Sequence, residues 1–385
     1  MNIEEKKFFA FRKTFPAYSQ CIYMNHAAVS PLSQNVKNSL INYWRNRSHI
    51  PVDIYPSIMD TLEEFKEMIC KLIHAKNSDE IAIIPNTSSG LNIVASGLKW
   101  KKGDRIILNT MEFPANVYPF MNLEKRGIII DWVKPVNGKI QVKDIESLVT
   151  NKTRLLSISF VQFINGFKAD LEAIGKLCKQ KGIWFVVDGI QGVGAIPIDV
   201  MKCNIDAFVS GGHKWLMWPM GTGFLYTNKK LLSNIQPTYA GWLSVKNSWD
   251  FFDYKLNFLD TAEKFQPGTL NFMGLVAAHK MLSIFLELKI ENIFHRILSL
   301  TDILIHGINN LSIKIITPEH KSIRSGIISI EVPDPEKIFD ELYANHIFAA
   351  LREGIIRFSI HCTNTTEDIE KVLRCLKEIT KRNIK

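Results

Sequence analysis

The sequence is poor in cysteine and has no long apolar run. Its six cysteines are irregularly spaced along 385 residues, and no Cys-x-x-Cys pair occurs. This spacing argues against a disulfide framework and predicts reduced, buried thiols. Nowhere do eighteen apolar residues follow one another, and the first residues lack the apolar segment of a secretory signal. We therefore expect a cytoplasmic protein with no membrane partner.

Clustered positive charge is also missing. The chain carries 47 Lys and Arg against 38 Asp and Glu, a formal net charge of +9. The basic residues are scattered, and the densest groups, 99–105 and 377–385, are short. A nucleic-acid site requires basic residues that are clustered or set in a known motif. We expect no nucleic-acid partner, although the sign of the charge suits an anionic cofactor and substrate.

Common nucleotide and metal motifs are absent. There is no P-loop, no His-Glu-x-x-His and no paired Cys/His spacing, so we predict no metal site. The segment Gly192-Val-Gly194-Ala-Ile-Pro197 begins like a dinucleotide fingerprint. Proline replaces its third glycine and no helix is predicted after it, so the match fails.

The middle of the chain alternates short apolar runs with amphipathic segments. This alternation predicts an α/β fold with an open, mostly parallel, doubly wound sheet. The expected strands are residues 81–84, 105–108, 128–133, 155–160, 184–187, 207–209 and 223–226. The expected helices are residues 61–74, 88–98, 116–126, 142–149 and 170–181.

The pattern changes after residue 274. Long helical segments (274–288 and 291–310) precede strands at 313–316, 326–332 and 355–360, with helices near 336–345 and 367–381. A chain of this length normally divides into two domains. We predict a large domain at 17–274 and a smaller α+β domain at 275–385. The N-terminal residues 1–16, with a helix at 4–15, are assigned to the smaller domain, although composition alone does not place that helix.

The most informative stretch is Trp184-Phe-Val-Val-Asp188-Gly-Ile-Gln191, followed by Ser210-Gly-Gly-His213-Lys214. Asp188 ends an apolar run, so we expect it at the carboxyl end of a strand, where ligands bind in open α/β sheets. Alone, Asp188 fits a helix N-cap equally well. Most lysines of this chain are expected at the surface, but an ordinary surface lysine is rarely flanked by a histidine, a tryptophan and glycines, as Lys214 is. An acid that keeps a ring nitrogen protonated and a lysine that forms an imine are the groups a pyridoxal phosphate (PLP) enzyme needs. Their joint occurrence with Gln191 favours that cofactor.

Three further segments carry candidate residues. Asn86-Thr87-Ser88 follows a strand and opens a helix, where hydroxyls and free amides can hold a phosphate or merely cap the helix. Phe113 follows Glu112 at a strand end and can stack on a cofactor ring or belong to the core. Arg357 and Arg352 are alternative clamps for a substrate carboxylate, and either also fits a structural ion pair.

Together these residues resemble the class V aminotransferase family of PLP enzymes, which have the fold-type I architecture. That family includes cysteine desulfurases, selenocysteine lyases, kynureninase and isopenicillin N epimerase-like proteins. The resemblance runs from Tyr23-Met-Asn-His26 to Arg357 and the helix starting near Thr366.

The resemblance implies a role for each candidate. Lys214 would carry the cofactor as an internal aldimine, with Asp188 on the pyridine nitrogen, Gln191 on the phenolic oxygen and His213 as a further catalytic residue. The other cofactor contacts would be Thr87, Ser88, Phe113, Asn116, Ser210 and Thr269. Thr269 would reach the neighbouring site of a homodimer. Substrate contacts would be His26, Arg357 and Arg352, with a side-chain pocket near Gln162, Phe163, Tyr239–Trp242 and Phe251–Tyr254.

Several departures from the family pattern bear on the reaction. Desulfurases carry a cysteine in a mobile loop shortly before the arginine, whereas residues 347–356 contain none. Cys362 lies beyond Arg357, so we expect no persulfide role for it. Ser210 lies four residues before Lys214, where the family has a serine three residues before its lysine. Phe113 replaces a histidine and removes a possible acid or base.

We expect a PLP-dependent enzyme that acts on an amino acid through aldimine and quinonoid intermediates. Lys214 would be the base that removes the α-proton. Aminotransferase-like or C–S lyase-like chemistry without the desulfurase loop cysteine is the expected outcome. The alternatives are an isopenicillin N epimerase-like racemase or epimerase, and a non-catalytic binding protein that keeps the fold.

Overall fold

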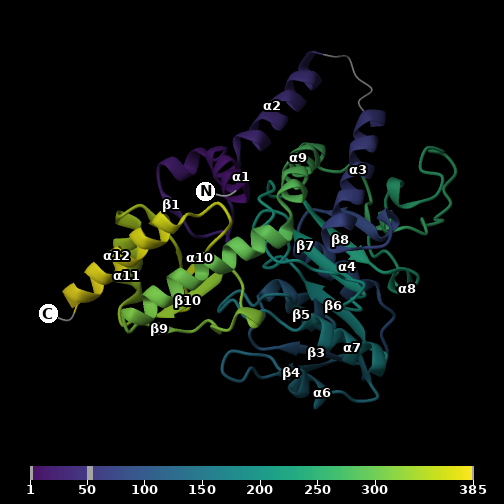
Figure 1. Cartoon of the computed structure of the whole chain (residues 1–385). Coiled ribbons are helices and arrows are strands. Elements are labelled where there is room, and N and C mark those ends of the chain that lie inside the picture. The colour runs from purple at the N-terminus through teal and green to yellow at the C-terminus, as the bar shows by residue number, and fades with distance from the viewer. Residues whose placement is uncertain (1–2, 50–54, 384–385) are drawn as a thin grey trace.

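The computed structural model describes residues 3–49 and 55–383, which fold around one large and one smaller sheet (Figure 1). The large sheet has the order β2-β8-β7-β6-β5-β3-β4. Within it, β8 is antiparallel to both neighbours and the remaining pairs are parallel. The strands are β2 (Ile81–Ile84), β3 (Arg105–Asn109), β4 (Ile129–Val133), β5 (Thr153–Ser159), β6 (Trp184–Asp188), β7 (Ala207–Gly211) and β8 (Gly223–Thr227). This confirms the predicted α/β fold.

Both faces of the large sheet are covered, which explains why its strands are apolar without alternation. In β6, Phe185 and Val187 belong to one hydrophobic cluster and Val186 to the cluster on the opposite face. The helices of this region are α3 (Tyr55–Ile73), α4 (Thr87–Gly97), α5 (Tyr118–Met121), α6 (Val142–Glu146), α7 (Leu171–Lys181), α8 (Lys229–Leu232) and α9 (Phe272–Leu288). Each fully buried large apolar side chain in these clusters contributes about 1.5–3 kcal/mol to the hydrophobic free energy of folding.

One predicted helix of this region is wrong. Residues 116–126 do not form a continuous helix but split into the 3-10 turn Pro114–Asn116, the short α5 and the 3-10 turn Glu124–Arg126. Pro119 lacks a backbone N–H and is therefore tolerated only in the first turn of a helix, which forces the helix to restart at Tyr118. The segment ends at Gly127, whose φ of +79° ends the last turn.

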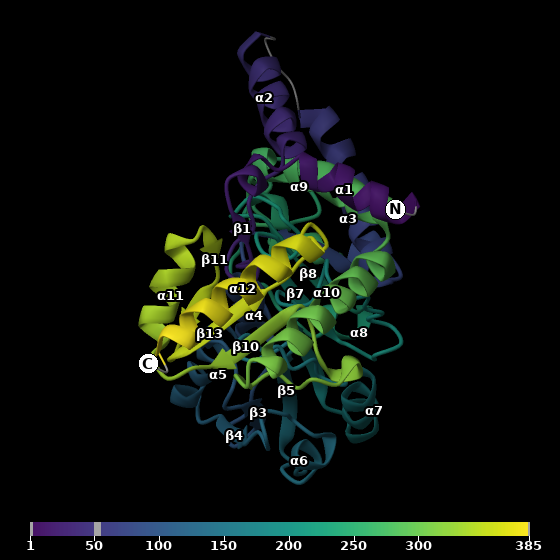
Figure 2. The same cartoon turned by 60° about the vertical axis from the view of Figure 1, so that its left-hand side comes forward.

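The smaller sheet is antiparallel and has the order β12-β13-β10-β9. Its strands are β9 (Lys314–Ile315), β10 (Ile327–Glu331), β12 (Ala350–Arg352) and β13 (Ile355–Ser359), and its helices are α10 (Ile290–Asn310), α11 (Pro335–Ala344) and α12 (Thr366–Asn383). The two views place these helices and strands together beside the large sheet (Figure 2). They enclose a separate hydrophobic cluster that includes Phe358, Leu342 and Leu376.

The N-terminal segment joins the two regions. Its elements are α1 (Ile3–Lys13), β1 (Ile22–Tyr23) and α2 (Gln34–His49), and β1 pairs in parallel with β11 (Ile347–Phe348). Phe11 of α1 packs against Phe285 of α9, with ring centroids 6.1 Å apart. Arg12 of the same helix makes an ion pair of 2.9 Å with Asp368 of α12. Helix α1 therefore contacts both regions, and the domain boundary at residue 274 stays a prediction.

None of the described helices combines the length and the apolar character that crossing a membrane requires.

Candidate active site

A cavity of about 320 Å³ lies at the carboxyl ends of β6 and β7. Asp188 is the last residue of β6, Lys214 follows the end of β7 by three residues, and Thr87 is the first residue of α4. Neighbouring parallel strands end at one edge of a sheet, and this gathers residues far apart in sequence. Predicted residues that line the cavity are Thr87, Ser88, Phe113, Asp188, Gln191, His213, Lys214, Arg352 and Arg357, and Ala27, Ala28 and Phe163 also line it.

A larger cavity of about 670 Å³ opens at the other end of the strands, beside Trp184 and Asp260. Trp184 is the first residue of β6, so this cavity lies at the amino ends of the strands. Ligands of open α/β sheets bind at the carboxyl ends. The smaller cavity is therefore the candidate active site.

Asp188 and Lys214 are the central charged pair of the cavity. The Asp188 side chain is 2% exposed and accepts a hydrogen bond of 3.0 Å from the Ile190 backbone N–H. Burial raises the pKa of Asp188, and it lowers the pKa of Lys214, because both charged forms lose hydration. The attraction between the two groups opposes both shifts in pKa. Lys214 Nζ lies 5.5 Å from the centroid of the Phe113 ring.

The amino end of α4 forms one wall of the cavity. Asn86 caps the helix, with its Oδ1 accepting a hydrogen bond of 2.9 Å from the Ser89 N–H. Thr87 Oγ1 accepts a hydrogen bond of 2.9 Å from the Gly211 N–H and keeps its own proton to donate. Free N–H groups and the helix dipole at such an end attract phosphate. Burial, followed by the nearby Lys214 charge, lowers the pKa of His213 at this wall.

Gln191 connects the cavity to the loop that carries the lysine. Its Nε2 donates to the Ala27 carbonyl at 3.0 Å, and its Oε1 accepts from the Trp215 indole at 2.9 Å. The second Nε2 hydrogen remains available to an acceptor in the cavity.

Both predicted arginines reach the cavity, but with different surroundings. Arg357 is 2% exposed, and its Nη1 donates to the Phe163 carbonyl at 2.8 Å. Its Nε has no hydrogen-bond partner within the described chain. Arg352 is exposed and donates to the carbonyl of its own neighbour Leu351 at 2.9 Å. Among residues 3–49 and 55–383, no carboxylate forms an ion pair with either of them.

Four predicted contacts do not line the cavity in this chain. His26 is fully buried behind it, with Nδ1 at 2.7 Å from Ser30 Oγ. Ser210 is fully buried, and its Oγ donates to the Gly211 carbonyl. Asn116 Oδ1 accepts a hydrogen bond of 2.6 Å from Ser157 Oγ, and its Nδ2 is buried with no hydrogen-bond partner among the described residues. Thr269 is exposed on the surface.

The aromatic loop predicted to shape a side-chain pocket also lies elsewhere. Trp242, Trp249 and Phe251 contact one another, with ring centroids 5.4–6.4 Å apart, and none of the three lines the cavity. Tyr239 and Tyr254 are exposed. Phe163, by contrast, lines the cavity and packs edge-on against Phe113, with centroids 5.3 Å apart.

Sequence reasoning gave Glu112 no role, yet it is a buried carboxylate close to the site. It accepts hydrogen bonds from the Ser159 N–H at 2.8 Å and from Gln162 Nε2 at 2.9 Å, and also from Asn109. Its charge adds to the rise in the pKa of Asp188. The available signal was its position at a strand end directly before Phe113.

The residues present fit a phosphorylated pyridine aldehyde. The cavity offers a lysine amine, a buried carboxylate, the amino end of a helix and an aromatic face within one enclosure. The unpartnered Arg357 Nε leaves a donor for an acidic substrate group. No group of three or more His, Cys, Asp or Glu side chains is arranged to hold a metal in the described part of the chain.

Comparison with known proteins gives consistent relatives. The sequence pattern of the class V aminotransferase family matches residues 22–372. A probable cysteine desulfurase of Pyrococcus abyssi is 29% identical and aligns over 96% of this chain and 97% of its own. The apo cysteine desulfurase of Thermococcus onnurineus has a TM-score of 0.88 at 24% identity, over 96% and 97% of the chains. A cystine C–S lyase bound to cysteine persulfide has a TM-score of 0.87 at 22% identity, over 94% and 99%.

The family match covers most of the chain, and another structural neighbour holds glycine covalently linked to its PLP cofactor. The cavity contains the lysine, the acid and the helix end that such a cofactor requires. The chain therefore belongs to the class V aminotransferase family, and it is a PLP-dependent enzyme.

Proposed function

We propose that this protein is a carbon–sulfur lyase that acts on a sulfur-containing amino acid by β-elimination. The observation that carries the proposal is a cavity that combines Lys214, Asp188 and Arg357 but has no cysteine in its lining. The related cystine C–S lyase, which has cysteine persulfide as its product, supports the same reaction class.

Asp188 and Lys214 divide the acid and base roles. When bound, PLP acts as an electron sink for negative charge that develops on the substrate α-carbon. The Asp188 carboxylate would hold the ring nitrogen in its protonated form. Burial lowers the pKa of Lys214, so its Nζ is available as a neutral base that accepts the α-proton.

Arg357 is the better candidate for the substrate carboxylate. It is buried, has no carboxylate partner among the described residues, and keeps Nε free, so binding a carboxylate satisfies an existing donor. Arg352 lies at the exposed side of the cavity. We assign it to a second acidic group of the substrate, such as the distal carboxylate of cystine.

The position of the cysteines favours elimination over sulfur transfer to the enzyme. Cys362, the cysteine closest in sequence to Arg357, is fully buried, and burial raises its thiol pKa well above the usual range. None of the other cysteines lines the cavity. In elimination, the carbon–sulfur bond breaks and sulfur leaves with the bonding electron pair. The remaining three-carbon fragment reacts with water to give a 2-oxo acid and ammonia.

We also infer that the enzyme works as a homodimer. Thr269 is exposed, and the loop between α8 and α9 carries Phe252 and Tyr254, which are 86% and 88% exposed. Large aromatic side chains with this exposure are typical of protein interfaces. A partner subunit docked on this loop would bring Thr269 to a neighbouring cavity.

An amino-acid panel that includes cystine and cysteine tests the proposed reaction. We expect 2-oxo acid, ammonia and a persulfide from cystine, without an added 2-oxo acid acceptor. Borohydride is expected to fix the cofactor on Lys214, and Lys214→Ala to lower kcat by about 100- to 10,000-fold. Lys168→Ala is the control, since Lys168 is a partly buried lysine outside the cavity.

The same assay distinguishes the alternatives. Dependence on an added 2-oxo acid would identify an aminotransferase, and inversion of the α-carbon an epimerase. Thiol-dependent formation of sulfide and alanine from cysteine would identify a desulfurase and contradict the argument from the cysteines. A protein that takes up no PLP would contradict the enzyme assignment.

A further inference from the structure

The backbone around Lys214 is held by hydrogen bonds from distant parts of the chain. The His213 carbonyl accepts from the Ser30 backbone N–H at 2.9 Å, and the Lys214 carbonyl accepts from Ser30 Oγ at 2.6 Å. The Trp215 carbonyl contacts His361 Nε2 at 3.0 Å. Three successive carbonyls are therefore anchored by the segment after β1 and by the residues that follow β13.

Hydrogen-bond stoichiometry fixes the tautomer of His26. The single proton of Ser30 is donated to the Lys214 carbonyl, so Ser30 Oγ must accept from His26 Nδ1, which is 2.7 Å away. His26 Nε2 is then an acceptor, and it faces the Tyr18 hydroxyl at 3.5 Å, the longest contact of this series. Tyr18 in turn accepts from Thr363 Oγ1 at 3.0 Å. Donors and acceptors match along the whole series.

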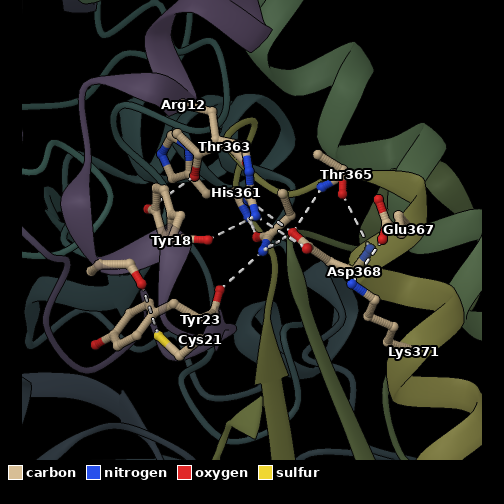
Figure 3. Close-up of polar contacts among 12 residues, drawn as sticks. Arg12, Tyr18, Cys21, Tyr23, His361, Thr363, Thr365, Glu367, Asp368 and Lys371 are labelled. Atoms are coloured by element: carbon tan, nitrogen blue, oxygen red, sulfur yellow. Dashed lines mark hydrogen bonds and ion pairs between the residues drawn. The ribbon is translucent and has the colours of Figure 1, made fainter. Parts of the chain in front are cut away.

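His361 has the opposite tautomer. Its Nδ1 accepts the Cys362 backbone N–H at 2.8 Å, so Nε2 carries the proton and donates to the Trp215 carbonyl. Figure 3 shows His361 and Thr363 beside Tyr18, with Arg12 and Asp368 continuing the polar contacts toward α12. Both imidazoles are fully buried and neither lines the cavity.

We propose that Ser30, oriented by His26, is a positioning residue for Lys214, and that His361 supports it by holding the next carbonyl. The lysine side chain has four rotatable carbon–carbon bonds, so a fixed backbone narrows the positions that Nζ can reach. Ser30 is 5% exposed and donates hydrogen bonds to the carbonyls of both Lys214 and His213. The inference rests on the proposed role of Lys214, although neither Ser30 nor His26 touches substrate or cofactor.

The test compares Ser30→Ala with Ser33→Ala in the PLP-loaded enzyme. Ser33 is also buried, three residues away, but its hydroxyl accepts from the Val36 N–H at 3.3 Å and does not contact the lysine loop. We expect Ser30→Ala to lower kcat by about 10- to 100-fold with KM little changed, because misplacing a reacting group weakens the chemical step. We also expect a shifted pH midpoint of the cofactor absorbance. Ser33→Ala should lower thermal stability without either effect, and Ser30→Thr, which keeps the hydroxyl, should restore kcat.

A second variant covers the case in which Ser30→Ala does not fold. Tyr18→Phe removes the donor to His26 while keeping the ring, and a smaller change of the same kind is expected. If the enzyme turns over none of the amino acids offered, the absorbance midpoint and the rate of borohydride labelling at Lys214 still report its position. Unchanged midpoints, labelling rates and kcat in Ser30→Ala and Tyr18→Phe would overturn the proposal.

Discussion

Burial acts on the titratable side chains near the cavity in opposite directions according to charge. It raises the pKa of Asp188 and lowers the pKa values of Lys214 and His361, because each group is pushed toward its neutral form. For Lys214 this increases the share of the neutral amine, whereas for Asp188 it increases the share of the uncharged acid while no positive charge other than Lys214 lies beside it. In His361 it keeps a neutral ring that donates to the Trp215 carbonyl.

Protonation of the buried His361 is expected to lower the stability of the folded protein at acid pH. Burial lowers its pKa to about 4, whereas an unfolded histidine titrates near 6.5. The pKa is lower in the folded protein than in the unfolded chain. The contribution of neutral His361 to the free energy of unfolding is therefore fully present above pH 6.5 and is lost as the pH falls from 6.5 to about 4. A shift of this size corresponds to about 3 kcal/mol. We expect His361→Gln, which keeps an N–H donor, to reduce the fall in Tm between about pH 7 and pH 4.

The comparison of the two proteins isolates the effect of His361, including the part by which its charge lowers the pKa of the buried His26. The raised pKa of Asp188 acts with the opposite sign over the same range, and both proteins contain Asp188. Its contribution therefore cancels in the difference. Equal slopes of Tm against pH in wild type and His361→Gln would contradict the assignment.

At the residue scale, prediction from sequence succeeded where strand ends determine position. Asp188 and Gln191 follow an apolar run, and Lys214 follows the next strand, so all three reach one edge of the sheet. His26 could not be placed in this way, because its environment is made by Tyr18, Ser30 and residues after β13. No local pattern reports contacts across more than 300 positions.

At the scale of elements, the apolar runs located every strand of the large sheet to within a few residues. The failures were local, as in 116–126, where a proline outweighs helical periodicity. The close approach of α4 to the sheet was not visible in the sequence. A Cβ on Gly90 would lie 2.4 Å from Val209 Cγ1, so this glycine permits the approach.

Gly90→Ala tests whether the close packing of α4 on the large sheet holds the amino end of α4 in place at the cavity. We expect a loss of about 1–3 kcal/mol in stability from overpacking, together with weaker retention of PLP on dialysis, because α4 must move away from β7. Gly175→Ala on α7 is the control for overpacking, since its Cβ would lie 1.7 Å from the Cys203 carbonyl oxygen and neither residue lines the cavity. It should lose stability but keep PLP. Equal retention of PLP would contradict the role given to α4.

At the scale of the whole molecule, the cavity takes residues from the N-terminal segment, the large sheet and β12–β13. Within a single chain, Phe252 and Tyr254 of the aromatic loop and Thr269 are exposed, and none of the three lines the cavity. The sequence pattern predicted the α/β architecture. It could not predict the pairing of β1 with β11, because the pairing of segments far apart in the chain produces no periodic pattern in the sequence.

The double variant Phe252→Glu/Tyr254→Glu tests the inferred dimer. Placing two carboxylates in a desolvated interface should weaken association by at least about 30-fold, measured by sedimentation velocity. Tyr343→Glu on α11, where the ring is 57% exposed, serves as the control for a surface charge. Wild type sedimenting as a monomer, or the double variant keeping its dimer, would contradict the inference.

The hydrogen bonds that join residues 12–30 to Lys214 and to residues 359–368 have a consequence for synthesis on the ribosome. A nascent chain that has emerged only as far as β8 already contains Asp188 and Lys214 but lacks both arginines and His361. Its lysine has neither a finished enclosure nor a complete anchor. Translation order therefore completes the surroundings of Lys214 only after β12, β13 and His361 have been delivered.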